Sequence, residues 1–157
     1  MSITSLITPS GNYISSSCTV VLNSQWRASS KSNPNSSLYS IYESYSNYNV
    51  NSGTAIMYID IVGYTEFTCY VRSYGESCCD YVMISQLDKT ISGSTSYTNS
   101  LVKAHTANNS VSGTALSNYT KVTYSGIDGG SHRITVVYRK DGSVHSGDDR
   151  GYILIPK

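Results

Sequence analysis

Alternation of apolar and polar residues is the feature that most constrains the fold of this chain. Near the C-terminal end, Ile134, Val136 and Tyr138 share one face of an extended run, while Val137 falls on the polar side with Arg133. A period of two is typical of a β-strand with one buried face. The 3.6-residue period of an amphipathic helix is absent throughout the sequence. The pattern therefore predicts an all-β fold.

Three such runs close the chain, at residues 118–125, 132–139 and 151–155. Asp128-Gly129-Gly130 lies between the first two, and Lys140-Asp141-Gly142-Ser143 follows the second. Glycine adopts positive φ without steric cost, and Asp-Gly is a common hairpin turn. We therefore expect these runs to form an antiparallel meander, in which each strand pairs with the next.

Further strand-like runs recur at intervals of roughly 8–12 residues, which is typical of a sandwich or jelly roll. They are residues 2–7, 18–23, 38–43, 54–62, 65–72, 80–87 and 101–104. Residues 54–62 are apolar on both faces, so we expect this run in the middle of a sheet. In the next run Phe67, Cys69 and Val71 are expected to face inward. We predict an antiparallel β-sandwich, jelly-roll-like, with about nine to eleven short strands.

A chain of 157 residues is expected to form one domain. We expect residues 54–156 to form the core sandwich, and residues 1–53 to add N-terminal strands and a tyrosine-rich loop. The net charge of +1 and the lack of a basic stripe argue against a nucleic-acid partner. No apolar run reaches the roughly 18 residues of a membrane span, and no signal peptide is visible. The residues leave open whether the chain is a fragment.

The four cysteines match no zinc-binding spacing; they are Cys18, Cys69, Cys78 and Cys79. Adjacent strand residues point to opposite faces, so we expect Cys78 and Cys79 to make a poor metal pair. Without a visible signal peptide the thiols are expected to be mostly reduced. Cys69 is expected to be a small core residue.

Tyrosine is unusually abundant, with 15 Tyr against one Phe and one Trp. Tyrosine suits ligand recognition through its flat amphipathic ring, but it also fills half-buried strand positions. Tyr39, Tyr42, Tyr45 and Tyr48 recur at every third position. Two interpretations stay open for them. They form either a stacking platform for a ligand or a loop whose rings cover the edge of a sheet.

Two further groups are candidate binding residues. Arg72, Tyr74 and Glu76 combine a guanidinium, a ring and a carboxylate, which suits a sugar or peptide site and equally suits an ion pair that stabilises a loop. Asp148 and Asp149 precede the last strand and offer carboxylate oxygens to Ca²⁺, which takes six to eight oxygen ligands. The alternative is a turn held by backbone hydrogen bonds to aspartate. We expect no other cofactor.

No catalytic signature is present. The three histidines are His105, His132 and His145, and none lies in a His-Glu-x-x-His motif. The Gly-x-Ser-x-Gly motif of a nucleophile elbow is also absent. We therefore expect a non-enzymatic protein.

Several segments together carry a family resemblance. Residues 70–76 (Y-V-R-S-Y-G-E), 80–88 (D-Y-V-M-I-S-Q-L-D), 134–141 (I-T-V-V-Y-R-K-D) and 149–152 (D-R-G-Y) are the ones concerned. They resemble β-sandwich modules in virion and surface proteins of phages that infect gut bacteria, including the crAss-like group, and in related bacterial surface proteins. The Asp-Tyr-Val strand also resembles its counterpart in CUB-type and MAM-type jelly rolls. The likeness spans roughly residues 54–156, departs from the pattern at Cys78-Cys79, and implies no catalytic residues.

The resemblance implies a binding or display module on a phage particle, as a head fibre, decoration or tail-associated protein at the virion surface. Its expected ligand is glycan of the host envelope or of mucus. One alternative is a purely structural capsid or fibre protein that contacts other virion proteins or forms a homo-oligomer. Another is a carbohydrate-binding module at the bacterial cell surface or outside the cell. A Ca²⁺-dependent, lectin-like domain is a further hypothesis.

Overall fold

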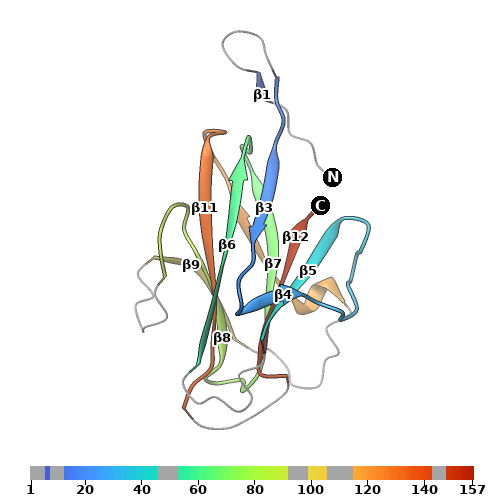
Figure 1. Ribbon diagram of the computed structural model, residues 1–157, viewed down its shortest axis with the longest axis vertical. Helices are drawn as coiled ribbons and strands as arrows, with labels where there is room; N and C mark the ends of the chain where they lie inside the picture. Colours follow the sequence, from blue (N-terminus) through green and yellow to red (C-terminus); the bar gives the residue numbers. More distant parts are fainter. Residues whose placement is uncertain (1–5, 8–12, 46–52, 92–98, 106–114, 143–147) are drawn as a thin grey trace.

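A computed structural model describes most of the chain. The described residues are 6–7, 13–45, 53–91, 99–105, 115–142 and 148–157. Within them, two five-stranded antiparallel sheets pack face to face as a β-sandwich (Figure 1). This confirms the predicted fold class. No helix in the described part of the chain is both long and apolar enough to cross a membrane.

The first sheet has the strand order β10-β7-β12-β5-β4, and the second has the order β3-β6-β11-β8-β9. The strands of the first sheet are β10 (Thr120–Tyr124), β7 (Phe67–Tyr74), β12 (Arg150–Pro156), β5 (Tyr39–Ser44) and β4 (Trp26–Ala28). Those of the second are β3 (Ser17–Val21), β6 (Thr54–Val62), β11 (Ser131–Arg139), β8 (Tyr81–Ser85) and β9 (Ser100–His105). A two-stranded hairpin, β1 (Leu6–Ile7) with β2 (Tyr13–Ile14), precedes them, and a short 3₁₀-helix, η1 (Leu116–Asn118), precedes β10.

The pairing follows a nested order. β8 pairs with β9, β7 with β10, β6 with β11 and β5 with β12, all antiparallel. Such nesting, with the pairs distributed alternately over two sheets, is the topology of a jelly roll. β3 and β4 extend the sheets beyond β6 and β5.

The predicted C-terminal meander is wrong, because β10, β11 and β12 do not pair with one another. β10 lies beside β7, β11 lies between β6 and β8, and β12 lies between β7 and β5. The turn at Gly129, whose φ is +79°, carries the chain from one sheet to the other. The β10–β11 connection is hydrogen-bonded to the β6–β7 connection. Gly63 N–H donates to Gly129 O at 2.9 Å, and Ile127 N–H donates to Thr65 O at 3.0 Å.

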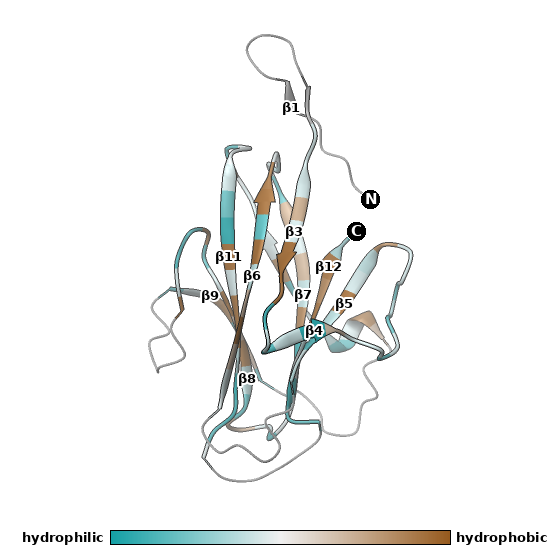
Figure 2. Cartoon of the chain, viewed as in Figure 1, coloured by the Kyte–Doolittle hydropathy of each residue, from teal (hydrophilic) through white to brown (hydrophobic). Residues whose placement is uncertain are grey.

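The core lies between the two sheets. Phe67, Cys69 and Val71 face inward from β7 as predicted, and each is at most 2% exposed. Met57 and Ile59 face inward from β6, which is an interior strand as predicted. Fully burying an aliphatic or aromatic side chain contributes roughly 1.5–3 kcal/mol. Apolar residues dominate β6 and the lower part of β11 in Figure 2, whereas the upper part of β11 is hydrophilic.

Each sheet also carries a smaller apolar cluster on its outer face. On the first sheet it contains Ile41, Tyr119, Tyr152 and Leu154. On the second it contains Tyr81, Met83, Ile91 and Val137. Val137 was predicted on a polar face but is fully buried, because Ile91, beyond the end of β8, packs against it. Thr135 on the same face is also buried, and its hydroxyl donates to Lys89 O at 3.3 Å.

Candidate functional site

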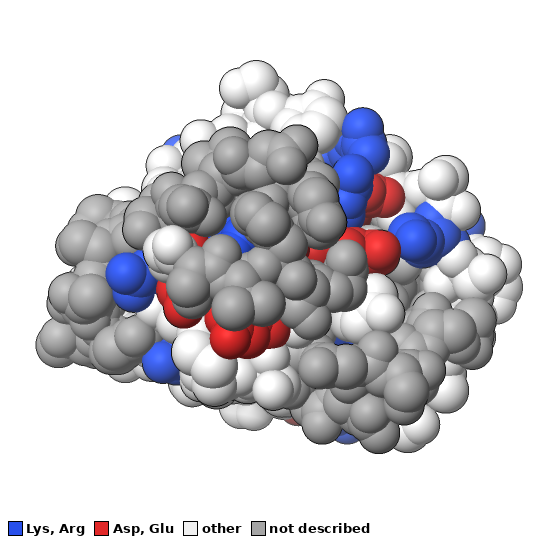
Figure 3. Space-filling view, turned by 90° about the horizontal axis from the view of Figure 1, so that it is seen from below, with Lys and Arg blue, Asp and Glu red and all other residues white. Residues whose placement is uncertain are grey.

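Three carboxylates meet at the lower end of the sandwich. The loop of residues 75–80 passes from β7 in the first sheet to β8 in the second and supplies Glu76 and Asp80. Asp141 follows the end of β11. One oxygen of each carboxylate lies within 4.8 Å of the other two. We call Glu76, Asp80 and Asp141 the carboxylate cluster. Figure 3 looks onto this end and shows acidic side chains near its centre.

Asp80 holds the two segments of the cluster together. It is fully buried. Its Oδ2 accepts a hydrogen bond from Glu76 N–H at 2.9 Å, and its Oδ1 accepts one from Asp141 N–H at 2.9 Å. The backbone N–H groups of Glu76 and Asp141 therefore hold the Asp80 carboxylate in place, and the side chains of both residues belong to the same cluster.

A buried tyrosine hydroxyl lies beside Asp80. Tyr138 is 0% exposed, and its hydroxyl has no hydrogen-bond partner among the described residues. A Cβ atom added to Gly75 would lie 2.6 Å from Asp80 Oδ2 and 2.9 Å from this hydroxyl, so both oxygens border the same small space. Burial raises the pKa of Tyr138, and the nearby charges of Asp80, Asp149 and Asp141 raise it further. The hydroxyl is therefore neutral, with lone pairs available for a cation.

The carboxylates repel one another. Two unit charges separated by 4.8 Å interact by roughly 3–4 kcal/mol at an effective dielectric constant of about 20. Lys140 and Asp149 are also fully buried at this end of the molecule. In addition, Glu76 Oε2 is buried without a hydrogen-bond partner among the described residues. A bound cation would relieve the repulsion and satisfy this oxygen.

The ligand set fits a hard divalent cation. Ca²⁺ binds oxygen ligands at about 2.3–2.6 Å, so ligands on opposite sides of one ion are about 4.8 Å apart. The separations within the carboxylate cluster do not exceed this value. Zn²⁺ and other softer ions favour nitrogen and sulfur ligands, which the cluster does not supply.

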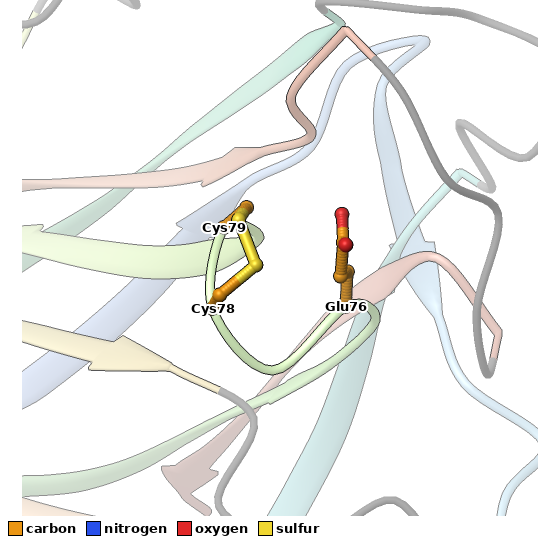
Figure 4. A group of neighbouring side chains, drawn as sticks. All are labelled: Glu76, Cys78 and Cys79. Carbon is orange, nitrogen blue, oxygen red and sulfur yellow. A yellow bond between two sulfur atoms is a disulfide. The ribbon is translucent and has the colours of Figure 1, made fainter.

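A disulfide bond joins the adjacent residues Cys78 and Cys79 in the 75–80 loop. The prediction of reduced thiols is therefore wrong for this pair, whereas Cys18 and Cys69 are free thiols and Cys69 lies in the core. The argument that neighbouring cysteines point apart applies to strands, and this pair lies in a turn. Figure 4 shows the disulfide beside the Glu76 carboxylate.

The calcium candidates named from the sequence lie near the cluster but outside it. Asp148 accepts a hydrogen bond from Tyr152 at 2.5 Å and pairs with Lys31 at 3.2 Å. Asp149 is fully buried at the start of β12, with a φ of +48°. Glu76 was predicted as a site residue, but in a sugar or peptide site rather than a calcium site. Asp80 and Asp141 were not proposed, because the sequence does not show which loops the fold brings together.

The structure does not bring the four regularly spaced tyrosines onto one surface. Tyr39 lies on the outer face of the first sheet, whereas Tyr42 packs against the inner core. This follows from the period of two along β5, which places residues three apart on opposite faces. Tyr45 is exposed, with the Arg27 guanidinium 4.9 Å from its ring centroid. Tyr48 lies outside the described residues.

A different set of rings lines the outer face of the first sheet. Tyr39 and Tyr70 make an edge-to-face contact at 5.5 Å. The Arg72 guanidinium lies 4.9 Å from the centroid of Tyr74 and 5.9 Å from that of Tyr152. We call Tyr39, Tyr70, Arg72 and Tyr74 the outer aromatic face. The predicted set of Arg72, Tyr74 and Glu76 is thus divided, because Glu76 belongs to the carboxylate cluster.

A cavity of about 420 Å³ lies over β3, β6 and β11 towards the opposite end. Arg133 and Asp60 lie opposite each other on β11 and β6 and both line the cavity. Arg133 Nε donates to Asp60 Oδ1 at 2.7 Å, and Arg133 Nη2 donates to Asp60 Oδ2 at 2.9 Å. His132 also lines the cavity, and its two ring nitrogens lie 2.6 Å from Asp88 and Asp128. These carboxylates raise the pKa of His132, since only a doubly protonated ring donates to both.

No family model, curated protein or solved structure matches this chain. The class of this protein is therefore defined by its structure alone. It is a jelly-roll β-sandwich with a carboxylate cluster at one end, where loops from the two sheets meet.

Proposed function

We propose that this protein is a non-enzymatic binding module whose loop end is organised by a calcium ion. The carboxylate cluster, with the unpartnered hydroxyl of Tyr138 beside it, is the observation that carries the proposal. Glu76, Asp80 and Asp141 would hold the ion. The ion would fix the 75–80 loop to the segment after β11, so that a rigid loop surface faces the ligand.

Calcium binding is tested by calorimetric titration and by thermal unfolding with and without a chelator. At a calcium concentration of 100 times Kd, binding stabilises the fold by about 2.7 kcal/mol. For a chain of 157 residues this corresponds to a rise in Tm of roughly 5–10 °C. The absence of both heat and a Tm shift at millimolar calcium would overturn the proposal.

Two isosteric variants locate the ion. Glu76→Gln and Asp141→Asn remove one charge each while preserving side-chain shape, and the Asp141 backbone contact to Asp80 is retained. Both should abolish the calcium-dependent Tm shift. Asp148→Asn is the matched control, since its carboxylate lies nearby but contacts Tyr152 and Lys31 instead. Loss of the shift in the control as well would place the ion elsewhere.

Glycan binding is the second candidate function, and the outer aromatic face supports it. Its rings and the Arg72 guanidinium combine flat apolar surface with hydrogen-bond donors, a combination that suits the two sides of a sugar ring. A glycan array tests this with native protein and with Tyr74→Ala, which should lose the signal. Tyr45→Ala is the control, because this exposed tyrosine contacts Arg27 and is not one of the rings that define the outer aromatic face. No signal, or equal loss in both variants, would refute the assignment.

Display on a phage particle is the setting we propose for such a module, with glycan of the host envelope or mucus as its ligand. A purely structural role in a capsid or fibre is the alternative, and a bacterial surface location is another. An antibody against the chain, applied to purified particles and to cell fractions, separates these settings. A stable oligomer in light scattering would favour the structural role.

A further inference from the structure

The 75–80 loop contains a second group of potential metal ligands. Glu76, Cys78 and Cys79 each offer one ligand atom within 4.8 Å of the other two. Glu76 therefore belongs both to this group and to the carboxylate cluster. The backbone keeps the residues together, since Glu76 O accepts hydrogen bonds from Cys79 N–H at 3.2 Å and from Asp80 N–H at 3.1 Å.

An independent feature points to a ligand at Glu76. Its Oε2 is buried and has no hydrogen-bond partner among the described residues. A buried carboxylate oxygen without a partner is costly, and a metal ion is one of the few groups that satisfy it. Figure 4 shows this carboxylate beside the two sulfur atoms.

The disulfide is accessible from solvent. Cys78 is exposed and Cys79 is half-buried, so a small reductant reaches the bond. The other two cysteines do not compete for metal. Burial raises the pKa of Cys18 to about 12 and raises that of Cys69 as well, which keeps both as thiols at neutral pH.

We propose that reduction of the Cys78–Cys79 bond converts this loop into a site for a thiophilic divalent ion of the Zn²⁺ class, held by both sulfurs and the Glu76 carboxylate. A dithiol reductant would supply two electrons. The S–S bond breaks, each sulfur gains a proton, and the reductant becomes a disulfide. Metal binding then releases the thiol protons to solvent.

Zinc should also compete with calcium for Glu76, an expectation that rests on the calcium site proposed above. Sulfur and mixed sulfur–oxygen sets favour zinc over calcium. Because both ions would use the Glu76 carboxylate, zinc bound to the reduced loop should weaken calcium binding. The oxidised loop offers no thiolate and holds Glu76 for calcium alone.

The experiment uses the full chain and Co²⁺ as a spectroscopic probe for zinc. Reduced native protein should develop the near-ultraviolet thiolate-to-cobalt band, and equimolar Zn²⁺ should abolish it. Oxidised protein should show no band. The double variant Cys78→Ser with Cys79→Ser should lose the band, Glu76→Gln should weaken cobalt binding about tenfold or more, and Cys18→Ser should leave it unchanged. Circular dichroism of each reduced sample checks that the fold is retained.

Absence of the band in folded, reduced native protein would overturn the proposal, as would a band of equal strength in the double serine variant. Calcium titration of the reduced protein with and without Zn²⁺ tests the competition, and an unchanged calcium affinity would refute it. If the oxidised protein binds no calcium, the proposed function fails. The cobalt measurement still decides the thiol site, so the two failures are distinguishable.

Discussion

Glu43 is the buried charge on which the stability of the first sheet should depend most. It lies on β5, and its side chain is 5% exposed. Its carboxylate accepts hydrogen bonds from Ser29 Oγ at 2.5 Å and from Arg27 Nη2 at 3.3 Å, and it pairs with Arg150 Nη1. These contacts join β4, β5 and the start of β12.

Replacing Glu43 by Gln keeps the side-chain shape and removes the charge. Hydrogen bonds to charged groups contribute about 1.5–3 kcal/mol each, and removing one member of a buried ion pair costs about 3–5 kcal/mol. Arg27 is 46% exposed, so its share is small, whereas Arg150 is 20% exposed and would keep an uncompensated charge. We expect Glu43→Gln to lower the free energy of unfolding by about 3 kcal/mol, and the Tm by roughly 6–12 °C.

Urea titration followed by tryptophan fluorescence measures the change, since Trp26 lies on β4 in the core. Asp60→Asn is the matched control. Asp60 and Arg133 make two hydrogen bonds with N···O distances of 2.7 and 2.9 Å, which is better geometry than that of Glu43 with Arg27. However, the side chains of Asp60 and Arg133 are 40% and 51% exposed. Loss of this pair should therefore cost less than about 1 kcal/mol. Equal costs for the two variants would refute the reasoning that burial, rather than geometry, decides the value of these pairs.

Two further predictions concern other parts of the sandwich. The pKa of His132 is raised, and the pKa values of Asp88 and Asp128 are lowered, by their mutual contacts. Stabilisation by this group is therefore lost as the pH rises through the raised pKa of His132, whose ordinary value is 6.5. It is also lost as the pH falls through the lowered pKa values of the two aspartates, whose ordinary value is 3.8. The Tm difference between native protein and His132→Gln should peak between about pH 4 and 6.5, and a flat difference would contradict this. Separately, Gly151→Ala should destabilise the fold by about 1–3 kcal/mol in urea titration, because its Cβ would lie 2.7 Å from Val82 Cγ2. Gly130→Ala, where only the exposed Asp128 is close, should cost less.

Much of the fold could be predicted from local patterns. The alternation in residues 65–72 identified the inward face of β7, and the apolar run at residues 54–62 identified an interior strand. Strand pairing could not be predicted this way. Alternation specifies which side chains are buried but not which strand lies alongside, and the jelly roll pairs β12 with β5 across most of the chain.

The candidate site was harder to predict for the same reason. Glu76, Asp80 and Asp141 come from two loops that lie far apart in the sequence and meet only because β7, β8 and β11 reach the same end. Tyr39 and Tyr42 show the converse error. They are regularly spaced in the sequence, but the two-residue period of the strand places them on opposite faces of the sheet. The Cys78–Cys79 bond was not predicted, because the strand geometry used for neighbouring residues does not apply to the turn in which this pair lies.

The position of the carboxylate cluster implies a local effect of calcium. The cluster joins the first sheet, through the end of β7, to the second sheet, through β8 and β11. β11 has nine residues, so its far end lies about 30 Å away at roughly 3.3 Å per residue. A chelator should therefore speed amide hydrogen exchange at Glu76, Asp80 and Asp141. It should speed exchange less at Gly63 and Ile127, whose amides donate to Gly129 and Thr65 at the other end, because calcium affects them only through global unfolding. Equal acceleration at both ends would show that calcium acts on global unfolding alone, and unchanged exchange at both would show that no ion crosslinks the sheets.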